Sequence, residues 1–430
     1  MLLLGEKVFR CFNEAIRLKD NNSKVWFENG KCAYNIASYI SRIIKFGPVL
    51  ENSRKEAMNQ RRKQFLDQAR VCFESANKFA NADEIWMNYY FLGKIAERSN
   101  ILQTLRYYEL SKIHMLSTPA ILSYRNNVNN KCFRAEIHYR IHACVLKYIY
   151  RHKTPPAKIL SQIMLFLIRA EKSYYVAKFN PRDETDDEIM EDANETVTDL
   201  VTLVQDEILE SDSEKLFTRI VQMCLEEFLH ILEDYHQHYK SLYRIAHHYF
   251  LTKDYRFSQK VLTKSFQSPI TSQGSTSDEE SSTDSDYTFE GLFDLTVPSR
   301  LFPLQRTPSG ILKRPGNYIT HMLRSTQLLI NVNKNLGDSE QLFKIATLLC
   351  KSTYQGYLLE TDRINLGKQA MKHCLNIYER QIAKAKGNRN NLDKIKDDVR
   401  KICKKLIEYR IYKQQAQQFL EKHVECITID

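Results

Sequence analysis

The sequence predicts an all-α fold assembled from helical hairpins, and three observations support this prediction. Glycine and proline are scarce, at 12 and 10 of 430 residues, which leaves few positions for the tight turns of a β-protein. Apolar residues make up 43% and charged residues 27% of the chain, which is typical of folded globular proteins. Along most segments the apolar residues recur every three or four positions, the period of one helix face.

Glycine and proline divide the chain into helical segments. Residues 1–46 are expected to form two helices that stop at Gly47-Pro48, and residues 64–117 to be helical throughout. A basic stretch at residues 54–63 is interpreted as a solvated helix face, with a nuclear localisation patch as the alternative. Further helices are predicted at 131–151, 157–178, 215–267, 317–385 and, as one basic helix, 392–423.

Two acidic segments interrupt a basic chain whose net charge is +11. Residues 183–214 hold 14 acidic residues and residues 278–290 hold 6, and neither segment contains lysine or arginine. The basic remainder suits acidic partners, nucleic acid among them, and is a poor surface for basic histones. Histones would instead meet the acidic segments.

These features divide the chain into five parts. The acidic segment is expected to be disordered to about residue 192 and helical beyond it, and residues 268–289 to be disordered. The expected organisation is N-terminal helical repeats at 1–182, the acidic segment at 183–214, a helical hairpin at 215–267, a low-complexity and proline-containing linker at 268–316, and a C-terminal helical region with a basic tail at 317–430.

The linker contains candidate phosphorylation sites. Ser275, Ser277, Ser281 and Thr283 each precede an acidic residue by three positions, the pattern that acid-directed kinases prefer. Each phosphate adds about −1.5 to −2 charges beside a basic body. We therefore expect phosphorylation to draw the linker onto that body and to compete with acidic partners.

Residues 239–269 match the tetratricopeptide pattern, in which two antiparallel helices within about 34 residues cross at small side chains. Ala246 is the small crossing residue of the first helix, and Lys253-Asp254-Tyr255 forms the turn. The second helix carries its packing residues at spacings of four and three. The packing residues predicted for this hairpin are Leu242, Ala246, Tyr249, Tyr255, Ser258, Leu262 and Ser265.

Two degraded copies of the pattern precede this hairpin. Trp26 and Gly30 have the spacing of a first helix, and Ala69, Phe73 and Ala76 that of a second, with a long basic insertion between them. Another first helix contains Leu92, Gly93 and Ala96, but its partner at residues 101–115 fits the pattern poorly. The predicted fold is therefore a degenerate tetratricopeptide-like solenoid with disordered acidic insertions.

Three blocks of sequence carry a family resemblance. The first joins CFESA at 72–76 to WMNYYFLGKIAE at 86–97 and EIHYRIHACVLK at 136–147, and the second is SLYRIAHHYF at 241–250. The third contains RPGNY at 314–318, His321-Met322 and Arg324-Ser325, followed by Tyr357-Leu358 and Thr361-Asp362-Arg363. In this order, over roughly residues 64–380, the blocks resemble the Cabin family, the large tetratricopeptide-type subunit of HIRA histone chaperone complexes.

The resemblance implies a nuclear, non-enzymatic scaffold that binds other subunits of such a complex during replication-independent nucleosome assembly. Members of the family are far longer, so this chain looks like a fragment or a short relative. Histones and calcineurin stay open as further partners, while a membrane, a cofactor and a small-molecule substrate are not expected. The candidate partner-binding residues are Arg314, Pro315, Gly316, Tyr318, His321, Arg324, Asp362 and Arg363.

The third block also has a local structural interpretation. Pro315-Gly316 is expected to make a turn, and Asn317 to cap a helix that begins at Tyr318. Ile319, Met322, Leu323, Leu329 and Ile330 would form its buried face. Arg314, His321 and Arg324 either clamp the acidic end of a neighbouring helix near Asp362 or form a docking site for a partner subunit.

Two alternative functions stay open. One is nucleic-acid binding by a basic helical protein, because residues 380–413 hold 12 basic and 4 acidic residues. The other is a tetratricopeptide adaptor of a different complex, such as a calcineurin regulator.

No catalytic or metal-binding motif is predicted. His138 and His142 stand one helical turn apart, but Glu136 lies outside the HExxH pattern, and we interpret them as partly buried repeat histidines. The ten cysteines are scattered without a CxxC pair and are expected to be reduced.

Overall fold

The structure is a computed structural model, and the part of the chain that it describes is helical almost throughout. Fifteen helices account for nearly all of the described residues, which confirms the all-α fold class. None of these helices combines the length and the apolar character needed to cross a membrane. The described residues are 2–46, 51–97, 99–116, 128–152, 155–179, 213–234, 238–264, 266–267, 288–289, 291–293, 315–350, 358, 360–385, 389–408 and 413–424.

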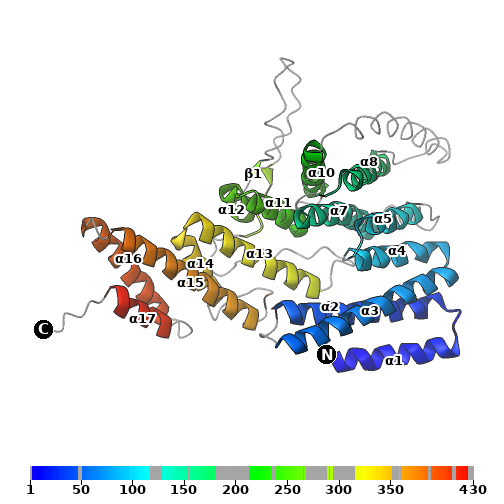
Figure 1. Ribbon diagram of the computed structural model, residues 1–430, viewed down its shortest axis with the longest axis horizontal. Helices are drawn as coiled ribbons and strands as arrows, with labels where there is room; N and C mark the ends of the chain where they lie inside the picture. Colours follow the sequence, from blue (N-terminus) through cyan, green and yellow to red (C-terminus); the bar gives the residue numbers. More distant parts are fainter. Residues whose placement is uncertain are drawn as a thin grey trace, which may run out of the picture. The chain divides into compact units, whose positions relative to one another are not determined.

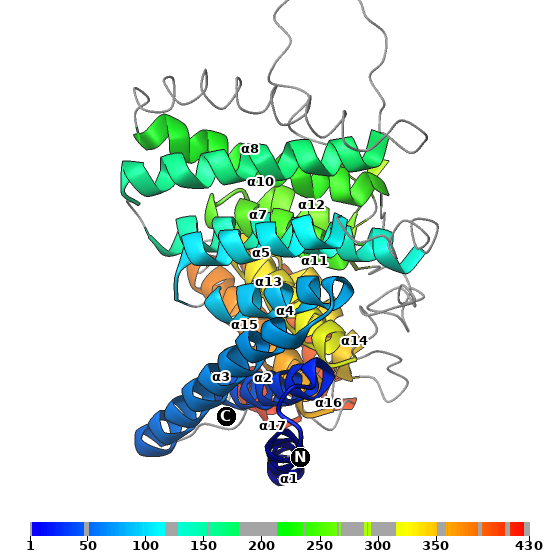
Figure 2. The ribbon, with the colours of Figure 1, turned by 90° about the vertical axis from the view of Figure 1, so that its right-hand side faces the viewer.

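The chain divides into two compact units, Met1–Glu227 and Phe228–Asp430. In the first unit most helices from α1 to α7 pack mainly against their neighbours in the sequence, with α2 on α3 and α4 on α5 as the closest pairs, and α8 contacts both α5 and α7. Figures 1 and 2 both show α1 at the bottom of this unit, α4, α5 and α7 above it, and α8 and α10 at the top. The helices are α1 (Leu2–Leu18), α2 (Ser23–Phe46), α3 (Asn52–Phe79), α4 (Ala82–Ala96), α5 (Ile101–Leu116), α7 (Val128–Arg151), α8 (Ala157–Phe179) and α10 (Ser213–Asp234), the last of which ends in the second unit.

The second unit repeats this nearest-neighbour packing. α11 packs on α12, α13 contacts both of them, and α14 packs on α15. Its elements are α11 (Tyr239–Leu251), α12 (Tyr255–Thr263), β1 (Phe266–Gln267), β2 (Thr288–Phe289), α13 (Pro315–Leu336), α14 (Ser339–Cys350), α15 (Glu360–Ala385), α16 (Arg389–Glu408) and α17 (Lys413–His423).

Short polar residues begin several of these helices. The side chain of Asn22 accepts hydrogen bonds from the backbone of Lys24 and Val25 at the start of α2. Asn100, Asp254 and Asp338 likewise accept from a backbone N–H three residues on, at the starts of α5, α12 and α14. Each cap satisfies a backbone donor that the first helical turn leaves without a partner.

The expectation of a structure without any sheet is wrong at one point. β1 pairs antiparallel with β2, with Phe266 opposite Phe289. Just beyond β2 the backbone N–H of Phe293 donates to the carbonyl of Leu262 at 2.7 Å, and the Phe293 side chain is buried. The chain therefore returns to the C-terminal end of α12, where burial of Phe293 offsets the cost of closing the loop. Residues 268–287 lie outside the described part.

The C-terminal tail forms two helices instead of the single helix expected over 392–423. α16 and α17 pack against each other, and Leu406 of α16 and Leu420 of α17 are both buried. One straight helix would hold these two side chains about 21 Å apart along its axis, at 1.5 Å per residue. Packing of two shorter helices is what allows both leucines to leave water.

Candidate functional site

The hairpin predicted at residues 239–269 is present as α11 and α12. Ala246 and Ser258 are both fully buried where the two helices cross, and the Ser258 hydroxyl donates to the Ala246 carbonyl at 2.8 Å. Lys253 makes the turn with a positive φ of 68°, and Asp254 caps α12. Serine therefore stands at the small crossing position without leaving a buried hydroxyl unsatisfied.

The other packing residues of this hairpin divide into two groups. Leu242 and Leu262 are buried at 2% and 0% exposure, as the repeat pattern predicts. Tyr249 and Tyr255 are half-buried and pack at a tilt against Phe257 and Phe250, at ring-centroid distances of 4.4 and 5.6 Å. The side chain of Ser265 lies outside the described residues.

The first degraded copy is a complete hairpin of α2 and α3. A Cβ atom on Gly30 would lie 3.0 Å from the Phe73 ring, so the helices touch at the position where the pattern requires a small residue. Ala69, Phe73 and Ala76 are fully buried. The basic stretch at residues 54–63 is helical and mostly exposed, as the interpretation of a solvated helix face predicts, and it lengthens α3 at its N-terminal end. This gives the stretch a structural role as an extension of the hairpin.

The second degraded copy, α4 with α5, also crosses at a glycine. A Cβ atom on Gly93 would lie 2.7 Å from the Tyr108 ring. Thr104, Tyr108 and Ser111 are fully buried at spacings of four and three, like the packing residues of α3 and α12. Residues 101–115 thus pack on α4 although Thr and Ser stand where the repeat pattern has alanine. Both hydroxyls bond to backbone carbonyls, those of Asn100 and Trp86.

The third sequence block begins α13 earlier than expected. The helix starts at Pro315, so Pro315 and Gly316 belong to its first turn and Asn317 does not cap it. Proline is favoured at the start of a helix because its missing N–H needs no partner there. Arg314 lies outside the described residues, as do the side chains of Pro315, Gly316 and Tyr318.

The buried face predicted for α13 is confirmed wherever its side chains are described. Met322, Leu323, Leu329 and Ile330 are at most 5% exposed, and the side chain of Ile319 lies outside the described residues. His321 is half-buried, and its ring lies against Tyr239 and Tyr243 of α11, at centroid distances of 5.5 and 6.3 Å.

Arg363 has a structural role in the same unit. Its guanidinium donates to the carbonyl of Leu349 at 2.6 Å, in the last turn of α14. A cation at this end of a helix satisfies a free carbonyl and interacts favourably with the helix dipole. Asp362, beside it, lies in the first turn of α15, where a negative charge stabilises the helix. Arg324 is half-buried on α13.

The phosphorylation candidates Ser275, Ser277, Ser281 and Thr283 all lie outside the described residues, as does nearly all of the acidic segment at 183–214. The eight cysteines that the structure describes are free thiols. Burial raises the pKa of Cys72, Cys374 and Cys403 to about 12, so these side chains are unreactive thiols at neutral pH.

A buried polar cluster in the first unit was not foreseen. Arg140 of α7 donates to Glu97, at the end of α4, and to Glu136, both at 3.0 Å. Lys147 and the Tyr108 hydroxyl also contact Glu97. Burial raises the pKa of Glu97, but the charges of Lys147 and Arg140 and the Tyr108 hydrogen bond hold it well below its ordinary range. The cluster therefore ties α4, α5 and α7 together through an ionised carboxylate.

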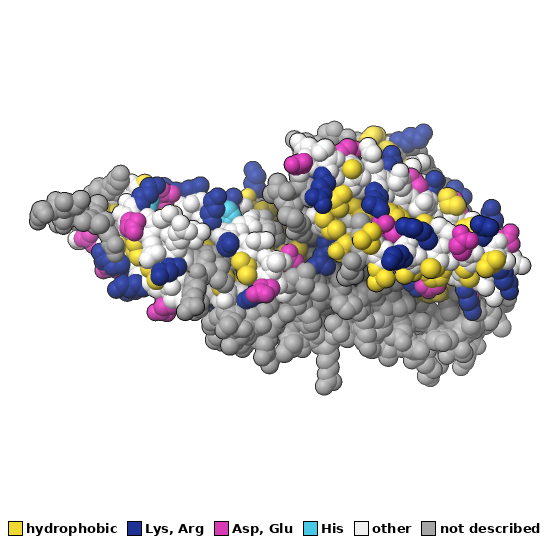
Figure 3. Space-filling model, turned by 90° about the horizontal axis from the view of Figure 1, so that it is seen from below, with side chains coloured by type: hydrophobic (Ala, Val, Ile, Leu, Met, Phe, Trp, Pro, Cys, Tyr) yellow, Lys and Arg dark blue, Asp and Glu magenta, His cyan; other side chains and the backbone are white. Residues whose placement is uncertain are grey.

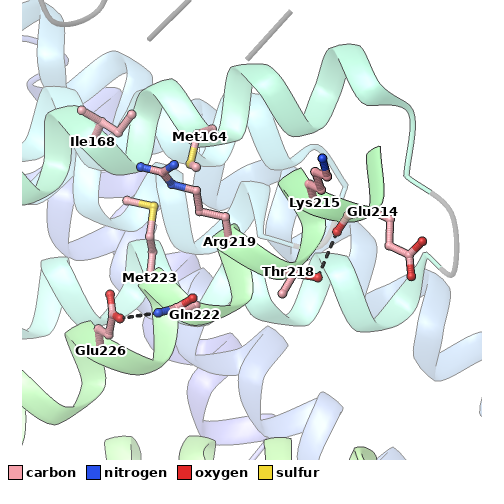
Figure 4. A pocket seen from close by; sticks show the side chains of 9 residues that line it. All are labelled: Met164, Ile168, Glu214, Lys215, Thr218, Arg219, Gln222, Met223 and Glu226. Carbon is pink, nitrogen blue, oxygen red and sulfur yellow. Dashed lines mark hydrogen bonds between the residues drawn. The ribbon is translucent and has the colours of Figure 1, made fainter. Parts of the chain in front are cut away.

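A groove of about 780 Å³ lies between α8 and α10. Figure 4 shows Met164, Ile168 and Met223 beside the Arg219 guanidinium, with Glu214 and Glu226 toward its two ends. Flexible methionines flanked by charges suit an apolar side chain of a peptide or helix. Its nine lining residues combine methionines and Ile168 with charged and polar side chains, which suits a binding surface.

No protein-family model matches the chain, and no solved structure matches it. The described site residues are thus of two kinds. The sequence-predicted residues form helix crossings and helix ends, while the Glu97 cluster and the groove arise from residues far apart in the sequence.

Proposed function

We propose that this chain is a non-enzymatic scaffold whose helical repeats bind other subunits of a HIRA-type histone chaperone complex in the nucleus. The observation that carries the proposal is the shared crossing of three hairpins. Gly30 meets Phe73, Gly93 meets Tyr108, and Ala246 meets Ser258.

The packing order supports a repeat solenoid as the basis of this scaffold. In both units helices pack chiefly against their nearest neighbours in the sequence, as expected when each repeat contacts only the next. Such an arrangement leaves extended helical surface open to partners. Surface of this kind is what a subunit needs in order to hold several others together.

The family resemblance is the reason for proposing subunits of a HIRA-type complex as the partners. Its first two blocks contain Phe73, Gly93 and Ala246, which all lie at the helix crossings. Its third block contains Arg324, which is half-buried and so accessible to a partner. Because the resemblance includes both crossing positions and a surface position, it favours a common scaffold with a common binding surface.

The exposed surface suits a protein partner that makes both polar and apolar contacts. Figure 3 shows one face on which lysine and arginine side chains lie among apolar ones. Leu3, Leu4 and Val8 of α1 and Val71 of α3 are exposed apolar residues of the first unit. Such surfaces favour protein contacts, and basic histones would meet the acidic segments instead.

A pulldown from nuclear extract tests the proposal. The tagged full chain should recover subunits of a HIRA-type complex, identified by mass spectrometry. The double variant Arg314→Ala, Arg324→Ala should lose them without a change in melting temperature. The matched control Lys334→Ala, Lys344→Ala removes two positive charges from α13 and α14 and should retain them. Recovery of a calcineurin complex alone, or of no chaperone subunit, would refute the assignment.

A second candidate function is DNA binding, favoured by the basic surface of α16. Lys394, Arg400, Lys401, Lys404 and Lys405 are exposed along this helix, although Asp397 pairs with Arg400 and Asp398 with Lys401. The measurement is a salt titration of duplex binding by the full chain. Each phosphate contact contributes about −0.9 to the slope of log affinity against log salt. A flat slope, or one unchanged by Lys404→Ala with Lys405→Ala, excludes α16 as the DNA-binding surface.

A further inference from the structure

Three buried ligand-type side chains meet between two helices of the first unit. His138 and His142 lie one turn apart on α7, and Glu227 lies on α10, 89 residues after His138. Their exposures are 1%, 0% and 2%. The histidines are thus fully buried, whereas the sequence had suggested partly buried repeat residues. Their acidic neighbour is Glu227, not the nearby Glu136 considered in the sequence.

The geometry brings one potential ligand atom from each residue into a common space. These three atoms all lie within 4.8 Å of one another. The two imidazole centroids are 4.6 Å apart, and His138 Nε2 contacts the carboxylate of Glu227. Tetrahedral ligands at about 2.0–2.2 Å from a metal ion lie about 3.3–3.6 Å from one another, so binding requires the hydrogen-bonded His138 and Glu227 atoms to separate and the metal to take the place of their proton.

His142 is held in the form that a metal requires. Its Nδ1 lies 2.9 Å from the His138 carbonyl, so that nitrogen carries the proton and donates it. Its Nε2 then presents a lone pair, buried and without a hydrogen-bond partner among the described residues.

A plain buried ion pair explains only part of this arrangement. His138 Nε2 contacts the Glu227 carboxylate, but His142 Nε2 stays a buried acceptor without a hydrogen-bond donor among the described residues, which is unfavourable. A metal ion accounts for all three residues. Two imidazole nitrogens and one carboxylate oxygen form a donor set that suits zinc, and a hydrogen bond from the other ring nitrogen to a carbonyl commonly orients such a ligand.

We propose that His138, His142 and Glu227 bind one divalent first-row metal ion, with Zn²⁺ as the best fit, and so cross-link α7 to α10. The ligands are the Nε2 atoms of both histidines and the Glu227 carboxylate, and water completes the coordination. Since all three side chains are buried, the site has a structural role. It links α10 to α7, two helices that the acidic segment separates in the sequence.

Metal analysis of the full chain tests this site. Protein stripped with a chelator and dialysed against Zn²⁺ should retain one zinc ion per chain, and zinc should raise its melting temperature. His142→Leu preserves side-chain volume and removes one ligand, so affinity should fall by more than about 100-fold, above the loss for an outer-shell partner. His230→Leu, on the exposed side of α10, is the matched control and should bind zinc like the parent protein.

Glu227→Gln provides a second variant that keeps the shape of the side chain. It should also lose zinc, so the test stands even if His142→Leu fails to fold. Co²⁺ in place of Zn²⁺ should give visible absorption bands that disappear in the same two variants. Parent protein that retains no zinc above background, or zinc binding that both variants preserve, overturns the proposal.

Discussion

Substitution of Gly93 by alanine probes the helix crossing on which the repeat assignment rests. The added Cβ would lie 2.7, 2.8 and 3.1 Å from three carbons of the Tyr108 ring. The ring has no room to move, because Tyr108 is fully buried and its hydroxyl donates to Glu97 at 2.6 Å. The contact must therefore be relieved by moving α4 away from α5.

The expected change in the free energy of unfolding is the sum of two opposing effects. Overpacking a core costs about 1–3 kcal/mol, and the upper end applies to a ring that is held on all sides. Alanine in place of a helical glycine returns about 1 kcal/mol of helix propensity. The net loss of stability is therefore about 2 kcal/mol, which lowers the melting temperature by about 4–8 °C for a unit of this size.

Thermal unfolding followed by circular dichroism measures this loss. Gly30→Ala is the matched control, because its Cβ meets the Phe73 ring at 3.0 Å and the Cys72 Cβ at 3.1 Å, so the loss should be smaller. In a Tyr108→Leu background Gly93→Ala should cost at least about 1 kcal/mol less, as expected for residues in contact. A Gly93→Ala variant that melts at or above the parent temperature would refute the crossing.

Two further substitutions test other parts of the fold. Ala246→Glu places a charge where α11 and α12 cross, so it should destabilise the second unit by about 4 kcal/mol or more. Leu251→Glu, 41% exposed on the same helix, should leave melting nearly unchanged, and equal effects would contradict the hairpin. Glu97→Gln should cost about 3 kcal/mol at pH 7, because Arg140 keeps Glu136 as a partner. Since the folded pKa of Glu97 is depressed, this contribution is complete above the unfolded pKa of about 4.3 and is lost as pH falls below it. A cost that persists undiminished in acid would show that the Glu97 charge is not its source.

Local sequence signals predicted the helices well, because their causes are local. Gly47-Pro48 does follow the end of α2, and the 3.6-residue period gave the buried face of α13. The split between α16 and α17 was missed, since it depends on two helices packing against each other. The pairing of α4 with α5 was indicated only by Leu92, Gly93 and Ala96, because α5 carries Thr104 and Ser111 where the pattern has alanine.

Contacts between residues far apart in the sequence left no local signal. Arg140 follows Glu97 by 43 positions, and Glu227 follows His138 by 89. Each residue alone reads as an ordinary charged or polar position on an amphipathic helix. Only the stacking of α4, α7 and α10 turns these positions into buried clusters, so no motif search over neighbouring residues could have found them.

The burial of the residues that carry the family resemblance determines what the resemblance can indicate about function. Ala76, Leu92 and Ala96 are at most 4% exposed, so likeness at these positions reports how the helices pack. Helix packing is shared by proteins with different partners, since it is fixed by side-chain size and not by recognition. In the third block Met322 and Ser325 are buried, whereas His321 and Arg324 are half-buried. Partner choice must therefore be read from the accessible residues of this block, and that is why the pulldown variants alter the arginines and leave the apolar face of α13 intact.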